Sequence, residues 1–174
     1  KTPGINVFQY AYTSNPDGKW YLEADVDDGL YLIRNKKTGL YLTVSDKYVR
    51  QSEYTTKNYT NQLFQIKVDN EGYYDIAPVS DTNNSISVRG WDMGNDKEGA
   101  YISCEPGQSS EGQCWRFILN GDGSYRIVSQ ISNCQKGITV LDNSSSNAYS
   151  YTYTKEINSN WELVKWYNTE SEHI

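Results

Sequence analysis

The residue types that carry most enzyme chemistry are scarce in this chain. The only histidine is His173, close to the end of the 174-residue sequence, so we expect neither a histidine-based triad nor an internal metal cluster. The adjacent acids Asp27 and Asp28 are typical of a solvated turn, whereas a glycosidase pair faces a cleft. The Asp-Gly turns lack the pattern of a phosphate-binding loop. We therefore predict a protein without catalytic activity, cofactor or metal.

Three cysteines leave the redox state of the protein open. Cys104 and Cys114 flank the polar loop EPGQSSEGQ and could close a small disulfide, which would leave Cys134 over. Three unpaired thiols are the alternative. Sequons for N-glycosylation, which matter only in a secreted eukaryotic protein, begin at Asn58, Asn83 and Asn143.

The elements that would position binding side chains recur along the chain as internal repeats. Each of three segments opens with an acidic residue and a glycine, continues as a β-rich strand and a polar turn, and ends in a second strand. The opening glycines, Gly29, Gly72 and Gly123, are separated by 43 and 51 residues. Each unit closes with an aromatic residue: Phe64, Trp115 and Trp161. These three residues are separated by 51 and 46 positions. Two sets of landmarks thus predict three units of similar length.

Composition and periodicity favour an all-β fold. Aromatic residues make up 14 % of the chain and charged residues only 22 %. Apolar residues alternate with period two, and no sustained helical period is present. Turn signals predict about four short strands per unit, and three such units can bury a shared core by closing the sheet. The sequence therefore predicts a β-trefoil of three pseudo-symmetric, four-stranded repeats.

The charge of the chain bears on its partners. A net charge of −6 weighs against nucleic acid and against an anionic membrane surface, because both require a basic patch. No apolar run approaches the roughly 20 residues that a membrane span needs. We expect neither nucleic-acid binding nor membrane insertion.

The closing motifs resemble the QxW repeats of the ricin B-type lectins, also called family 13 carbohydrate-binding modules. The middle unit keeps the motif in full as Gln113-Cys114-Trp115, the first has Gln62-Leu63-Phe64, and the third has Ser159-Asn160-Trp161. The resemblance covers about 27–166 and implies repeats at about 27–69, 70–120 and 121–166. We expect the closing aromatic residues and Val44, Val88 and Val140 to lie in the core. The glutamine should satisfy backbone groups of the turn.

The resemblance also implies a shallow sugar pocket in each unit. The family pattern uses an Asp in a Leu-Asp-Val strand, an aromatic residue on the next strand and an Asn before the QxW motif. Here the Asp is replaced by Thr43, Ser87 and Thr139, and a hydroxyl lacks the charge-assisted strength of a carboxylate. Acids that follow these strands could substitute, or could be ordinary turn residues; they are Asp46, Asp92 and Asp142.

Aromatic residues at the expected spacing complete the predicted sites. Tyr54 serves the first unit and Tyr151 the third, with Tyr153 as the alternative if the loop is shorter. The middle unit has no aromatic residue at this place, and Trp91 could compensate from a neighbouring loop. The predicted carbohydrate-binding residues are therefore Thr43, Asp46, Tyr54, Asn61, Trp91, Asp92, Thr139, Asp142, Tyr151, Tyr153 and Asn158.

The segments outside the repeats are short. Residues 1–26 are rich in aromatic side chains, which favours an extension packed on the barrel over a linker, and 167–174 form a polar tail.

The resemblance implies a secreted, carbohydrate-binding module that targets an attached hydrolase or toxin domain to glycans, most often galactose-containing ones. Two alternatives remain, a protein-binding trefoil with decayed sugar sites and a β-trefoil protease inhibitor, although no Pro- or Cys-braced reactive loop is evident.

Overall fold

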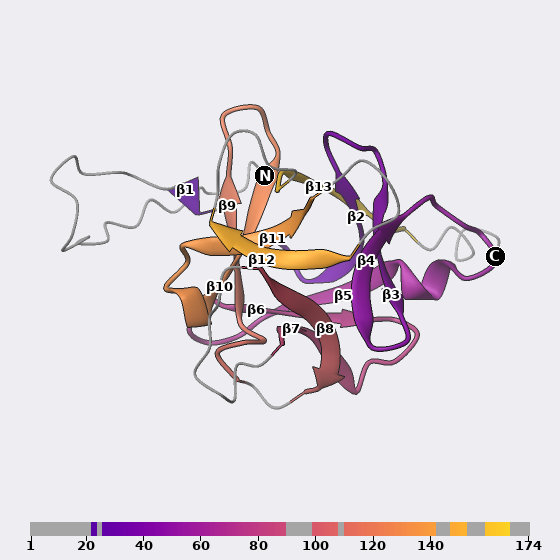
Figure 1. The fold of residues 1–174 in the computed structure, drawn as a ribbon, viewed down its shortest axis with the longest axis horizontal. Helices are drawn as coiled ribbons and strands as arrows, with labels where there is room; N and C mark the ends of the chain where they lie inside the picture. Colours follow the sequence, from indigo (N-terminus) through magenta and orange to yellow (C-terminus); the bar gives the residue numbers. More distant parts are fainter. Residues whose placement is uncertain are drawn as a thin grey trace, which may run out of the picture.

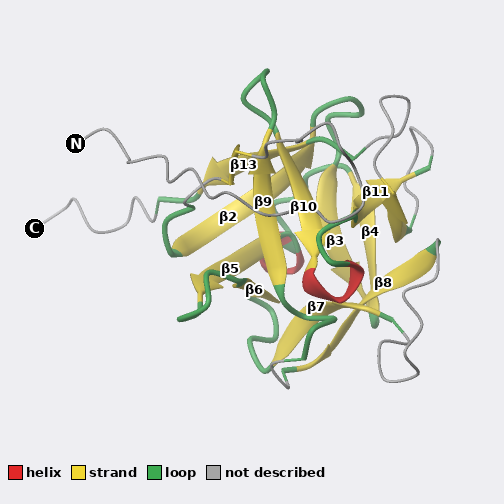
Figure 2. Cartoon of the chain, turned by 90° about the vertical axis from the view of Figure 1, so that its left-hand side faces the viewer, coloured by secondary structure: helices red, strands yellow, loops and turns green. Residues whose placement is uncertain are grey.

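The computed structural model describes residues 22–23, 26–89, 99–107, 110–141, 147–152 and 159–167, and strands dominate this part of the chain (Figure 2). The strands are β1 (Leu22–Glu23), β2 (Gly29–Asn35), β3 (Tyr41–Ser45), β4 (Tyr48–Ser52), β5 (Leu63–Val68), β6 (Tyr74–Pro78), β7 (Asn84–Val88), β8 (Ala100–Pro106), β9 (Trp115–Leu119), β10 (Tyr125–Ser129), β11 (Lys136–Val140), β12 (Ala148–Thr152) and β13 (Trp161–Lys165). Two short 3-10 turns join them, η1 (Tyr59–Asn61) and η3 (Gln130–Ser132). Within the described ranges, no helix has the length and hydropathy that crossing a membrane requires.

Six strands form a closed antiparallel barrel. Their order is β9-β6-β5-β2-β13-β10, and β10 pairs back with β9 to complete the ring. Closure leaves no exposed edge within the ring. The short β1 pairs with β9 from outside, with Leu22 opposite Leu119 (Figure 1).

The other six repeat strands form three hairpins that cap one end of the barrel. They are β3–β4, β7–β8 and β11–β12, and β8 pairs with both β4 and β12. An isolated bridge between Arg50 of β4 and Asn147, the residue before β12, completes the cap. Each unit thus supplies two barrel strands and one hairpin: β2–β5, β6–β9 and β10–β13. The predicted all-β class is confirmed, and the three units are consistent with a β-trefoil.

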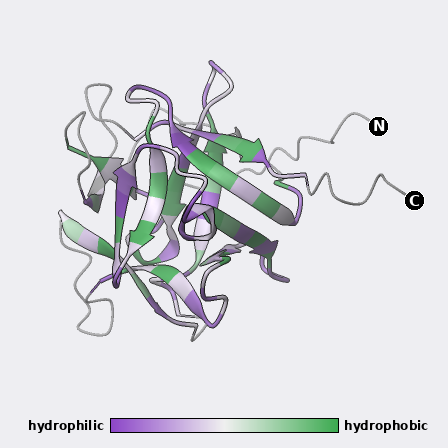
Figure 3. Ribbon diagram, turned by 90° about the vertical axis from the view of Figure 1, so that its right-hand side faces the viewer, coloured by the Kyte–Doolittle hydropathy of each residue, from purple (hydrophilic) through white to green (hydrophobic). Residues whose placement is uncertain are grey.

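The core is built from the residues that close each unit. Phe64, Trp115 and Trp161 are fully buried. Both tryptophans pair their indole N–H: Trp115 Nε1 donates to the carbonyl of Ile86 at 3.0 Å, and Trp161 Nε1 donates to the carbonyl of Ile138 at 2.8 Å. Apolar and polar segments alternate along the ribbon (Figure 3), as expected of strands with one face inward. The prediction that the closing aromatic residues belong to the core is confirmed.

Gly137 occupies a position in β11 with no room for a side chain. A Cβ atom there would lie 2.7 Å from the carbonyl oxygen of Ile127, a backbone atom in the neighbouring strand. We expect Gly137→Ala to lower the free energy of unfolding by about 1–3 kcal/mol, because two paired strands must separate to admit the methyl group. Urea unfolding measures this change. Gly121→Ala is the matched control, since nothing lies within 4 Å of its Cβ position; equal midpoints for the two variants would contradict the packing described.

None of the three cysteines forms a disulfide in this structure. Burial, helped by nearby carboxylates, raises the pKa of Cys104 to about 12 and that of Cys114 to about 11. Both therefore remain protonated at neutral pH, and a protonated thiol is a poor nucleophile. Of the two possibilities left open by the sequence, the structure has the one without a disulfide.

Candidate functional site

The candidate site lies on the outer face of the β3–β4 hairpin in the first unit. Leu42 and Val44 of β3 point into the core, so the alternate residues Tyr41 and Thr43 face outward. In the pairing of the two strands, Tyr41 lies opposite Ser52. The chain then leaves β4 and carries Tyr54 past the same face, toward η1.

Two hydroxyl groups form the polar part of this site. Thr43 Oγ1 and Ser52 Oγ are 2.6 Å apart, and Thr43 Oγ1 also lies 3.0 Å from the carbonyl oxygen of Tyr41. Gln62 Nε2 donates to both hydroxyls, at 3.0 and 3.1 Å. Thr43 is half-buried, so its hydroxyl is already well supplied with partners inside the protein.

Gln62 fixes the loop that carries Tyr54. Its side chain is fully buried. Oε1 accepts from the backbone N–H of Thr55 at 2.9 Å, and Nε2 donates to the carbonyl of Glu53 at 2.8 Å. The predicted role of this glutamine, to satisfy backbone groups of the turn, is confirmed.

The equivalent anchor is kept in the middle unit and changed in the third. Gln113 Nε2 donates to the carbonyls of Glu105 and Pro106 at 3.2 and 2.9 Å, and its Oε1 accepts from the Ser110 hydroxyl at 3.3 Å. Ser159 replaces the glutamine in the third unit, where its buried hydroxyl has no hydrogen-bond partner among the described residues. A serine side chain is too short to make the contacts that Gln62 and Gln113 make.

Tyr54 supplies accessible aromatic surface to the first-unit site. Its exposed fraction is 38 %, and its ring centroid lies 5.7 Å from that of Tyr41, with the rings tilted by 58°. Asn61 ends η1 beside Gln62 and is half-buried, with its backbone N–H donating to the carbonyl of Asn58 at 3.1 Å. The arrangement offers a ring face next to a row of hydroxyl groups, which suits a ligand with both C–H surface and hydroxyls.

Two other predicted residues lie apart from this surface. Asp46 occupies the exposed hairpin turn with a left-handed φ of 56°, five residues from Tyr41 and therefore about 16 Å along the strand. Thr139 is fully buried, and its hydroxyl donates to the carbonyl of Gly137 at 3.2 Å. A direct contact between Thr139 and a ligand would require this side chain to become exposed.

The remaining predicted side chains lie outside the described part of the structure. Trp91, Asp92, Asp142, Tyr153 and Asn158 lie outside the described residues, and only the backbone of Tyr151 is described, as part of β12. The part of the chain that is described contains no group of three His, Cys, Asp or Glu side chains that could hold a metal ion.

Strand register shows how the first and third units correspond. Val44 pairs with Val49 in the first hairpin as Val140 pairs with Ala148 in the third. Three residues before Val44 and Val140 in their strands, the first hairpin has the pair Tyr41–Ser52 and the third has the pair Gly137–Tyr151, so these two pairs correspond. Tyr151 is therefore the counterpart of Ser52, and Tyr153 is the counterpart of Tyr54 in sequence. The register favours the alternative in which the third loop is shorter.

Tyr41 and Ser52 belong to the first-unit surface in addition to the residues predicted from the sequence. The signal that would have found them is the period of two: both face outward with Thr43 once Leu42 and Val44 are assigned to the core. That Tyr41 and Ser52 lie side by side at the site also depends on the hairpin register, which pairs them with each other.

The barrel, the hairpin cap and the buried Gln-x-aromatic anchors define a trefoil of the lectin type. Residues 16–103 match the model of the family described as ricin-type beta-trefoil lectin domain-like. The chain belongs to this family. No sequence among the curated proteins matches it.

Solved structures share the fold. A designed three-fold symmetric protein, ThreeFoil, is 26 % identical with a TM-score of 0.69, over 80 % of this chain and 100 % of its own. A ricin B-like lectin from Macrolepiota procera, solved with lactose, is 13 % identical with a TM-score of 0.67, over 82 % and 99 %. A mosquitocidal holotoxin is 19 % identical with a TM-score of 0.70; the match covers 82 % of this chain and 18 % of the toxin.

Proposed function

We propose that this chain is a non-catalytic carbohydrate-binding domain and that its first unit carries a glycan site. The observation that carries the proposal is the surface on which Tyr54 and Tyr41 adjoin the Thr43 and Ser52 hydroxyls, with both hydroxyls bonded by Gln62. The tyrosine rings would stack on the C–H face of a pyranose. Ser52, Asn61 and backbone groups of the loop would bind its hydroxyl rim.

Affinity at such a site would be modest, and repetition would compensate for it. A shallow pocket with one stacked ring corresponds to millimolar binding, about 4 kcal/mol. Sites in two or three units would raise the avidity for a polyvalent glycan by ~10²–10⁴. We propose Tyr151, Tyr153, Asp142 and Asn158 for the third unit, and we propose Trp91 with Asp92 for the middle one.

The biological setting that we propose is a secreted protein in which this domain targets an attached hydrolase or toxin domain to glycans. Membership of a lectin-like family supports the binding role, and the match to only 18 % of the mosquitocidal holotoxin is consistent with a domain of a larger protein. The Macrolepiota procera lectin was solved with lactose, so galactosides are the first ligands to test.

A second candidate function, binding to a protein partner, is favoured by one observation. The Thr43 hydroxyl is engaged inside the first unit and Thr139 is buried in the third, so neither offers the free acceptor that a family sugar site has. A protein-binding domain would bind a deglycosylated partner, and free sugar would not displace it. Competition with lactose separates the two functions.

Tyr54→Ala is expected to weaken lactose binding about tenfold or more, because a stacked aromatic ring contributes about 0.5–1.5 kcal/mol beyond its buried area. Titration followed by NMR gives the affinity. Tyr54→Phe should retain binding, since the ring is kept. Tyr167→Ala is the control, as Tyr167 has the larger exposed fraction, 72 %, and lies outside the site. Equal affinities for Tyr54→Ala and Tyr167→Ala would contradict the proposed site.

A further inference from the structure

A second aromatic surface lies on the outer face of the hairpin cap, where β4, β8 and β12 meet. Tyr48, Tyr101 and Tyr149 form a row in which the ring centroids are 5.7 Å and 5.0 Å apart. Tyr101 is the central member, has an exposed fraction of 41 % and lies directly opposite Tyr149 in the strand pairing. We call these three residues the tyrosine row. The row draws one residue from each unit, so it exists only when the three hairpins assemble.

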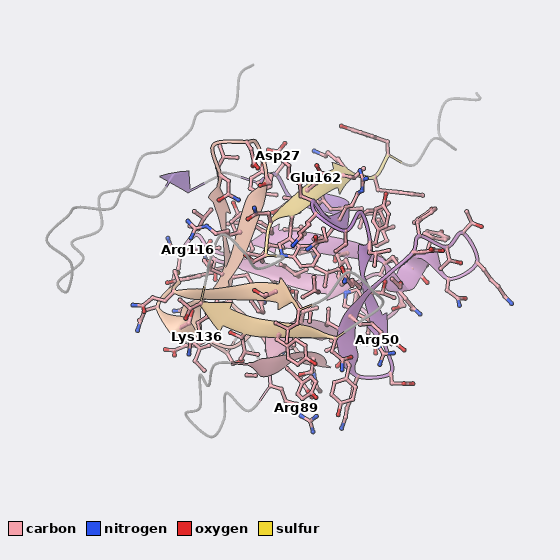
Figure 4. The ribbon with its side chains drawn as sticks, turned by 45° about the horizontal axis from the view of Figure 1, so that its top comes forward. Asp27, Arg50, Arg89, Arg116, Lys136 and Glu162 are labelled. Carbon is pink, nitrogen blue, oxygen red and sulfur yellow. The ribbon has the colours of Figure 1, made fainter. Side chains whose placement is uncertain are left out.

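Positive charge surrounds one end of the tyrosine row. The Arg89 guanidinium carbon lies 5.3 Å from the centroid of the Tyr48 ring, and its Nη1 donates to the Tyr48 hydroxyl at 2.6 Å. Lys47 Nζ lies 5.8 Å from the same centroid. Arg50 shares the outer face of β4 with Tyr48, two residues away. Figure 4 shows Arg89 at the lower end of the molecule, extending away from the barrel.

The charges of Arg89 and Lys47 are not neutralised within the described part of the chain. Neither side chain forms an ion pair there. Asp46 precedes Lys47 in the hairpin turn but does not pair with it. On a chain whose net charge is −6, this local excess of cations would attract an anionic group.

Unpaired polar atoms lie beneath the same surface. Ser103, which is in register with Tyr48, is fully buried, and its hydroxyl has no hydrogen-bond partner among the described residues. The buried Nε of Arg50 likewise has no partner there. Buried polar atoms without partners are uncommon in folded proteins, and two of them adjoin the tyrosine row.

The tyrosine row is distinct from the first-unit site. Tyr48 and Tyr54 stand at opposite ends of β4 and its following loop, six residues apart, which corresponds to about 20 Å of extended chain. The family resemblance places one sugar pocket in each unit, whereas the row lies where all three units meet.

We infer that this cap surface binds a saccharide that bears an anionic group, a carboxylate or a sulfate ester. The inference rests on the proposed carbohydrate-binding function and names a second site and ligand class for it. The tyrosine rings would pack on the C–H face of the sugar. Arg89 uses one N–H on Tyr48, which leaves further donors for the anion, and guanidinium groups bind such anions through two parallel hydrogen bonds.

Three sugars with the same pyranose test the inference: galacturonate, galactose 6-sulfate and galactose. Titrations followed by the aromatic ring signals of Tyr48, Tyr101, Tyr149 and Tyr54 report which surface each sugar contacts. We expect the two anionic sugars to shift the tyrosine row at concentrations at least tenfold lower than galactose does. Added NaCl should weaken the anionic sugars and leave galactose unchanged. Which anionic sugar binds better distinguishes carboxylate from sulfate recognition.

Three variants separate the contributions of charge and of aromatic packing to binding at the tyrosine row. Arg89→Gln should abolish the preference for the anionic sugars, and Tyr101→Ala should weaken all binding at the tyrosine row at least tenfold. Both positions are exposed, so one-dimensional NMR spectra should confirm that the fold is retained. Tyr54→Ala should leave the response of the row unchanged.

The outcomes separate this inference from the proposed function. Shifts at Tyr54 with neutral and anionic sugars alike, and none at the tyrosine row, would overturn the cap site and leave the first-unit site in place. An unchanged preference in Arg89→Gln would also overturn it. No response at either surface to any of the three sugars would remove both the inference and its basis.

Discussion

Replacing Trp161 with alanine is expected to lower the free energy of unfolding by about 4 kcal/mol, within the range of 3–5 kcal/mol that removal of a buried tryptophan costs. The side chain is fully buried, and its indole N–H donates to the carbonyl of Ile138 at 2.8 Å. The variant would leave both a cavity and an unpaired carbonyl in the third unit. Chemical denaturation monitored by circular dichroism gives the change.

Trp166→Ala is the matched control for Trp161→Ala. Trp166 is half-buried and stacks on Tyr59 with ring centroids 5.5 Å apart, so its removal opens no cavity in the core. We expect it to cost about 1 kcal/mol. If the two variants unfold at the same denaturant concentration, Trp161 does not have the role in the core that the structure assigns to it.

Gln62→Ala is expected to destabilise the domain by about 3 kcal/mol, because a buried network loses its central member. The backbone N–H of Thr55 and the carbonyl of Glu53 would lose their partner. The Thr43 and Ser52 hydroxyls would lose a shared donor. Because the same contacts fix the loop that carries Tyr54, glycan affinity should fall as well, under conditions in which the variant remains folded.

Gln65→Ala provides the comparison for Gln62→Ala. Gln65 is a half-exposed residue of β5, three positions along the chain. Its removal should change stability by less than about 0.5 kcal/mol, as for most surface substitutions. A Gln62→Ala variant that is as stable as Gln65→Ala, or that binds glycan with unchanged affinity, would show that the Gln62 network does not organise the site.

The repeats and the core could be predicted from the sequence because their signals are local. Strand alternation marks the inward residues, and the closing aromatic residues Phe64, Trp115 and Trp161 recur at similar intervals. The role of Gln62 also followed from its place in the motif. Each of these inferences needs only the residues within one unit.

The details of the surface depend on contacts between strands and could not be predicted in the same way. Thr43 and Thr139 hold equivalent places in their hairpins, yet one is half-buried and the other fully buried. Asp46 follows its strand closely but lies at the far end of the hairpin from Tyr54. Whether such a residue is exposed at the site depends on which side chains pack over it, and spacing along the chain does not predict that packing.

The tyrosine row is the clearest case of information that only the assembled fold supplies. Its members are far apart in the sequence, and no motif links them. Their contacts follow from the pairing of β8 with both β4 and β12. A shift of two residues in either register would separate the rings.

The measurement that tests the central claim most directly is a glycan array with the intact chain and a Tyr54→Ala, Tyr153→Ala double variant, since Tyr153 is the counterpart of Tyr54 in the third unit. Carbohydrate binding predicts that the wild-type chain binds a set of related glycans and that the double variant, although folded, binds neutral glycans at least tenfold more weakly, because two of the three proposed unit sites are lost. Retained folding is checked by circular dichroism on both proteins. A folded wild-type chain that binds no glycan at high protein density would contradict the account and favour a protein partner.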